Sequence, residues 1–144
     1  MVNEFTLQIG ALPYILDRDG PKFLLITSRR SQRWIIPKGS PKEGMVDHEL
    51  AELEAFEEAG IGGEIGTTAL GHYTDIRKYA DDGEFERLKI RVFPFLVAYQ
   101  YIDWPERGQR KHTWLGTRQA ASLVENGELA TIISEFDPTV LGLP

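Results

Sequence analysis

The sequence predicts an α+β fold within the broader α/β class: a mixed central sheet between helices, as in an α/β/α sandwich. Three observations support this prediction. Short stretches of apolar and β-branched residues are separated by glycine and proline, one long acidic helix is expected at residues 47–59, and two shorter helices are expected near the carboxyl end. Strands that precede and follow a long helix in the sequence are typical of a sheet covered by helices. The 144 residues are expected to form one domain, 1–144.

The strands are predicted from apolar stretches that end at turn-forming residues. They are expected at 5–16, 22–30 and 33–36, as short strands within 61–79, as a long strand at 85–101 and as a last strand at 112–115. In the long strand, the stretch LKIRV alternates apolar and basic residues, which predicts one buried and one solvent-facing side. Residues 37–44, PKGSPKEG, are expected to form a loop because of their proline and glycine content.

The helices are predicted from helical spacing and end signals. The long helix is expected to begin with Asp47 as its N-cap and to end before Gly60. The two shorter helices are expected at 118–124 and 128–136, separated by the stretch ENG. They would provide helical cover for the sheet at the carboxyl end of the chain.

The composition limits the kinds of partner. A formal net charge of −6 argues against non-specific binding to nucleic acid or to an anionic membrane, but it allows a small phosphorylated substrate that arrives with its own cations. The absence of cysteine excludes thiolate metal sites and disulfides. No apolar stretch has the length of a membrane span and the N-terminus does not resemble a signal peptide, so the cytoplasm is the expected location. The oligomeric state is left open, with a homodimer among the options.

Glu54, Glu57 and Glu58 gather at the carboxyl end of the long helix, where like charges repel one another and the helix dipole disfavours anions. One interpretation is a solvated acidic face, as in a simple acidic interaction domain. Helical geometry instead places Glu57 between Leu50 and Leu53, in the stripe that should face the core. A hard divalent cation such as Mg²⁺ or Mn²⁺ would relieve both the repulsion and the cost of burial. We therefore favour a metal site.

The stretch GSPKEGMVDHELAELEAFEEAGI, residues 39–61, resembles the Nudix box G-x5-E-x7-R-E-U-x-E-E-x-G-U, where U is aliphatic. The stretches DWPERGQRKHTW and LGTRQAASLV are similar to the tail of bacterial Nudix proteins on the diphosphoinositol-polyphosphate phosphohydrolase-like branch. The resemblance implies a Nudix-like fold and Mg²⁺- or Mn²⁺-dependent hydrolysis of a nucleoside diphosphate linked to another group. The positions that match the box are Gly39, Glu54, Glu57, Glu58, Gly60 and Ile61.

The catalytic and metal-binding carboxylates follow from this resemblance. Glu54, Glu57 and Glu58 would bind the metal, with Glu57 as the leading inner-sphere ligand. The general base would be one of these three or a carboxylate outside the box. Glu106 is the candidate for a fourth catalytic carboxylate, and an exposed loop charge is the equally weighted alternative.

Two positions depart from the box. Met45 replaces its first Glu and Leu53 replaces its Arg, which in the family is taken to orient the carboxylates through ion pairs. We expect a site that binds metal but holds its carboxylates less firmly. Two functions therefore remain as alternatives. One is a weakened enzyme, and the other is a Nudix-fold ligand-binding or regulatory module.

Basic residues supply candidates for substrate phosphates. Any one of them is more often a solvated charge than a ligand, but as a group they suit a highly phosphorylated substrate. Dinucleoside polyphosphates and diphosphoinositol polyphosphates are favoured within the wider class of phosphoanhydrides. The predicted substrate-binding residues are Arg29, Arg33, Lys38, Gly39, Arg87 and Lys89.

Overall fold

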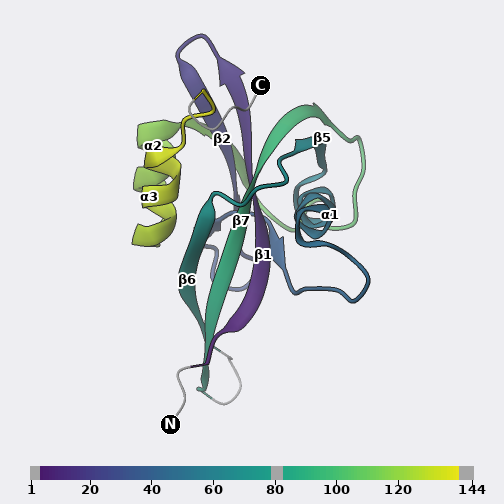
Figure 1. Ribbon diagram of the computed structural model, residues 1–144, viewed down its shortest axis with the longest axis vertical. Coiled ribbons are helices and arrows are strands. Elements are labelled where there is room, and N and C mark those ends of the chain that lie inside the picture. The colour runs from purple at the N-terminus through teal and green to yellow at the C-terminus, as the bar shows by residue number, and fades with distance from the viewer. Residues whose placement is uncertain (1–3, 79–82, 140–144) are drawn as a thin grey trace.

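The computed structural model describes residues 4–78 and 83–139, and within these ranges an eight-stranded mixed sheet lies between helices (Figure 1). The predicted fold class is confirmed. The long helix α1 lies on one side of the sheet, and α2 and α3 lie together on the other. The strands are β1 (Thr6–Asp17), β2 (Gly20–Thr27), β3 (Trp34–Ile35), β4 (Lys38–Gly39), β5 (Ile61–Ile65), β6 (Gly71–Lys78), β7 (Phe85–Gln100) and β8 (His112–Gly116); the helices are α1 (Asp47–Ala59), α2 (Thr117–Leu123) and α3 (Gly127–Glu135).

The sheet opens along one edge of β1. The other edge of β1 pairs in parallel with β7, and β5 and β6 pair antiparallel with β7. Along the open edge, Tyr14 to Asp17 pair with β2, whereas Ile9 and Gly10 pair with β4. Beyond Phe23, β2 leaves β1 and then pairs with β3, while β8 pairs with β2 from Lys22 to Ile26. The divergence of β2 and β4 creates the space in which the candidate site lies.

The core consists of one apolar layer on each side of the sheet. On β7, Leu88, Ile90 and Val92 are buried in the layer beneath α2 and α3, as the alternation in LKIRV predicts. Phe93 and Phe95 on the same strand are buried in the layer beneath α1. No helix in the described part of the chain is both long and apolar enough to cross a membrane.

Two local expectations differ from the structure. The N-cap of α1 is Val46 rather than Asp47, because the Asp47 carboxylate pairs with Arg91 at 2.7 Å instead of capping its own helix. Within the expected loop at 37–44, Lys38 and Gly39 form the short strand β4 because their backbone pairs with β1.

The carboxyl end of α1 depends on a glycine, as predicted. Gly60 adopts a left-handed conformation with φ of 68°, and its N–H donates to the Phe56 carbonyl. A Cβ at this position would lie 2.2 Å from the ring of Trp104. The side chain of Gln100 donates to the carbonyl groups of Ala59 and Gly60, at 3.0 and 2.7 Å. The end of α1 is therefore closed by β7 and by the loop that follows it.

Gly60→Ala should lower the free energy of unfolding by more than Gly44→Ala. Both glycines have positive φ, so each alanine carries a backbone cost of about 1 kcal/mol or more. The space around Gly44 is open, whereas Gly60 faces Trp104. Urea denaturation of both variants would measure the difference between their free energies of unfolding. This difference reports the clash with the Trp104 ring. Equal losses in the two variants would contradict this packing.

Candidate active site

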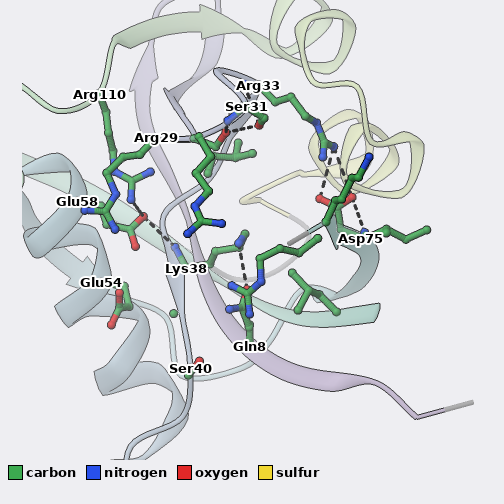
Figure 2. Close-up of a pocket in the computed structure, with 18 of the residues that line it drawn as sticks. Gln8, Arg29, Ser31, Arg33, Lys38, Ser40, Glu54, Glu58, Asp75 and Arg110 are labelled. Atoms are coloured by element: carbon green, nitrogen blue, oxygen red, sulfur yellow. Dashed lines mark hydrogen bonds and ion pairs between the residues drawn. The ribbon is translucent and has the colours of Figure 1, made fainter. Parts of the chain in front are cut away.

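A pocket of about 750 Å³ opens where β2 and β4 diverge from β1 (Figure 2). One wall carries carboxylates from α1, and the other walls carry basic side chains from several strands and loops. Seven of the lining side chains are Arg or Lys and four are Asp or Glu, although the chain as a whole has a net charge of −6. The pocket is thus a basic region on an acidic protein. Its charged residues are Arg29, Arg30, Arg33, Lys38, Glu54, Glu58, Asp75, Arg77, Lys78, Glu106 and Arg110.

The acidic wall consists of Glu54 and Glu58, one turn apart on α1. Their side chains are buried in the pocket wall, with 8% and 6% of each residue exposed. Glu57 is only partly buried and lies outside the pocket lining, so its expected place in the core-facing stripe is wrong. The buried face of α1 instead follows small residues, Ala51 and Ala55, which turns their neighbours Glu54 and Glu58 toward the sheet.

The carboxylate of Glu54 packs directly against the backbone of β4. A Cβ on Gly39 would lie 2.3 Å from the carboxyl carbon of Glu54, so this arrangement requires a glycine there. Next to it, the backbone N–H of Lys38 donates to Glu58 Oε1 at 3.3 Å. The two residues of β4 therefore hold the two carboxylates of α1 in place.

Burial changes the protonation of this pair. Desolvation raises the pKa of Glu58 to about 8, although the Arg110 guanidinium opposes the shift. Desolvation also raises the pKa of Glu54, and the nearby Glu57 charge adds to it. A raised carboxyl pKa means that the ionised form is poorly solvated, so stability from Glu58 falls as the pH rises toward 8. A bound cation would favour the ionised forms.

The basic walls lie opposite the carboxylates. Lys38 is largely buried, its Nζ donates to Gln8 Oε1 at 3.0 Å, and burial lowers its pKa. Arg29 points into the pocket and donates to Gln109, while Arg33 reaches toward Asp75 on β6 at 3.4 Å (Figure 2). These cations come from β4 and from the loop between β2 and β3. They can share the charge of one polyanion.

Comparison with known proteins agrees with this architecture. No family model matches the chain. Nudix hydrolase 12, mitochondrial, of Arabidopsis thaliana is 29% identical over 93% of this chain and 73% of its own length. Diphosphoinositol polyphosphate phosphohydrolase 3-beta of Bos taurus is 24% identical over 84% of this chain and 70% of its own length. The crystal structure of C. elegans Ap4A hydrolase has a TM-score of 0.65 and 18% identity, covering 95% of this chain and 99% of that one.

The chain has the Nudix fold, and its sequence relatives are Nudix hydrolases. In this Nudix-fold chain, the two apolar replacements in the box are part of the core. Met45 and Leu53 are partly buried and pack against the apolar layer beneath α1. Neither position therefore brings a charge to the carboxylates.

Two carboxylates are available in this site as ligands for a divalent cation. Within residues 4–78 and 83–139, no group of three or more acidic or histidine side chains is close enough to hold an ion. Glu54 and Glu58 are nevertheless adjacent, buried and rich in hard oxygen atoms. Mg²⁺ in phosphate-processing sites keeps several waters and uses one or two carboxylates together with substrate phosphates. The pair suits that kind of binding.

The predicted substrate residues separate into two groups. Arg29, Arg33, Lys38 and Gly39 line the pocket, and so does the fourth predicted carboxylate, Glu106. Lys89 instead lines a separate depression of about 280 Å³. The guanidinium of Arg87 lies over the ring of Phe5, at 5.0 Å from its centroid, outside the pocket lining. The structure thus brings only the first group together with the carboxylates.

Arg110 is one of the pocket residues that the sequence analysis missed. Its buried guanidinium contacts Glu58 at 3.7 Å and Glu106 at 2.9 Å, so a cation does reach the acidic end of α1. The available signal was its i, i+4 spacing from Glu106. Asp75, Arg77 and Lys78 on β6 were also missed, because nothing local in their sequence connects them with the box.

Gly39→Ala should displace the Glu54 carboxylate and weaken Mn²⁺ binding by ~10-fold or more, as other changes around metal ligands do. Stability should change little, because the displaced atoms are the end of a flexible side chain. Isothermal titration with Mn²⁺ would measure the affinity. Gly116→Ala is the matched control, because its Cβ would meet open space. Unchanged affinity in a folded Gly39→Ala protein would contradict the proposed role of this contact.

Proposed function

We propose that this protein is a Mg²⁺- or Mn²⁺-dependent hydrolase of phosphoanhydride bonds in a small, highly phosphorylated substrate. The observation that carries the proposal is a single pocket in which a buried carboxylate pair faces a wall of Arg and Lys. Hard cations bind the carboxylates, and basic side chains bind phosphate oxygens. This combination is what a phosphoanhydride requires, because its own negative charge repels an attacking nucleophile.

Glu54 and Glu58 would hold the cation, with Glu57 and Glu106 as further predicted catalytic carboxylates. The bound cation supplies charge neutralisation and a lower pKa for water. One of the carboxylates would accept the proton of the attacking water. Lys38, Arg29 and Arg33 would hold the phosphates in position from the opposite walls.

The pocket lining favours recognition by charge. Among the described residues that line it, none has an aromatic ring on which a base could stack. Tyr73 is buried in the core, and Trp114 packs against the apolar layer beneath α1. This supports a diphosphoinositol polyphosphate ahead of a dinucleoside polyphosphate, although the names of the bovine relative and the C. elegans structure point to one substrate each.

The alternative is a ligand-binding or regulatory module that turns nothing over, and the observation behind it is the apolar packing of Met45 and Leu53. The branch within the family and the oligomeric state, including a homodimer, stay predictions. The same holds for the cytoplasmic location, and the Arabidopsis relative carries the word mitochondrial in its name.

A substrate panel separates the two functions. The purified protein would be incubated with Mg²⁺ or Mn²⁺ at slightly alkaline pH and with diphosphoinositol polyphosphates or dinucleoside polyphosphates. Ion-exchange chromatography and ³¹P NMR would detect the products. We expect metal-dependent cleavage, and we expect Glu58→Gln to lower kcat by ~10²-fold or more.

Glu49→Gln is the control for this experiment, because Glu49 lies on the same helix but is exposed. It should leave turnover unchanged. Thermal stabilisation by a substrate without any product would contradict the enzyme and favour the module.

A further inference from the structure

Arg110 is a pocket side chain with several polar partners. It lies in the loop between β7 and β8, which passes beside α1 (Figure 1), and only 7% of its side chain is exposed. Its Nε and Nη2 each lie 2.9 Å from Glu106 Oε1, and Nη2 lies 3.7 Å from Glu58 Oε1. Its Nη1 donates to the Thr27 carbonyl at 3.1 Å. One guanidinium therefore joins α1, β2 and its own loop.

The arginine of the Nudix box is absent from this chain. Leu53 occupies the position at which the motif has an arginine, and its side chain packs against the apolar layer beneath α1. Two carboxylates as close as Glu54 and Glu58 repel each other and are costly to bury without a cation. Arg110 brings a positive charge to Glu58, one of these two carboxylates, from a distant part of the chain (Figure 2).

We propose that Arg110 is the positioning residue that orients Glu58 and Glu106, in place of the arginine missing at Leu53. This inference rests on the proposed function. Arginine suits the task because its planar fork has several donors in fixed directions. Its contacts with Glu58 and Glu106 are made to the Oε1 atom of each carboxylate.

Hydrogen bonds hold the loop on both sides of Arg110 in the sequence, so the fold sets the position of this residue. Thr27 exchanges backbone and side-chain hydrogen bonds with Lys111, at 3.1 and 2.9 Å. The N–H of Glu106 donates to the carbonyl of Glu57 at 3.0 Å, at the end of α1. The guanidinium is thus held between the end of β2 and the end of α1 before any ligand binds.

The test measures Mn²⁺ affinity by titration calorimetry, together with kcat and KM. Arg110→Ala should weaken Mn²⁺ binding by ~10-fold or more and lower kcat more than it raises KM. Leu53→Arg added to Arg110→Ala should recover part of the lost affinity. Leu53→Arg in the otherwise unchanged protein should add little, because Arg110 already fills the role. Arg107→Ala is the control, because Arg107 is in the same loop but exposed.

Arg110→Lys keeps the charge but loses the fork, and it covers the case in which Arg110→Ala does not fold. It should weaken Mn²⁺ binding at a nearly unchanged melting temperature. Wild-type affinity in folded Arg110→Ala or Arg110→Lys would overturn the inference, and so would a failure of Leu53→Arg to recover affinity. Mn²⁺ binding is measured without turnover, so the two proposals can fail separately. A wild-type protein that binds Mn²⁺ but cleaves nothing would refute the proposed function. The Mn²⁺ affinities of the variants would still test the role of Arg110.

Discussion

The burial of Glu54 and Glu58 at the carboxyl end of α1 is the constraint on which the site depends. Both carboxylates lie at the negative end of the helix dipole and close to each other, and desolvation raises the pKa of each. Burying an ion costs several kcal/mol unless other groups replace its hydration. Among the described residues, the N–H of Lys38 and the guanidinium of Arg110 provide part of that replacement for Glu58. The remaining cost is the one that the proposed cation would offset.

The divided edge of β1 makes this burial possible. Because β4 pairs with one half of this edge and β2 with the other, β4 brings its two backbone residues against α1 while β2 turns away. Gly39 accepts the Glu54 carboxylate only because it lacks a Cβ. The departure of β2 leaves space for the basic loop that carries Arg29 and Arg33. The topology of the sheet therefore determines which charges face one another.

The fold was largely predictable because its signals are local. The apolar stretches, the alternation in LKIRV and the glycine after α1 each specify their own element. Strand β4 was missed because two residues carry no periodicity, and it forms only through its pairing with β1. The N-cap was wrong because Asp47 has a stronger partner in Arg91, which is distant in sequence.

The site was only partly predictable, because its charges come together through tertiary structure. The glutamates of the box are close in sequence, whereas Arg110 and Asp75 reach the pocket from other elements. The alternation of β7 correctly separated its two faces, but it did not reveal that Lys89 would line a different depression. Glu57 was placed toward the core because leucines were weighted above alanines, and the packing of α1 follows the alanines.

The central claim is that an ionised Glu58 destabilises the metal-free protein and that a divalent cation offsets this cost. The most direct measurement compares the free energy of unfolding of wild type and Glu58→Gln, with EDTA or with Mn²⁺. The folded pKa of about 8 exceeds the ordinary value of 4.5, so the unfolded chain releases this proton first as the pH rises. The two proteins should have similar stability near about pH 5, where Glu58 is protonated in the folded state.

Near about pH 8.5, metal-free Glu58→Gln should exceed wild type by about 1 kcal/mol or more, and Mn²⁺ should stabilise wild type but not the variant. A metal-free wild type that is at least as stable as Glu58→Gln near about pH 8.5, with no response to Mn²⁺, would contradict the claim.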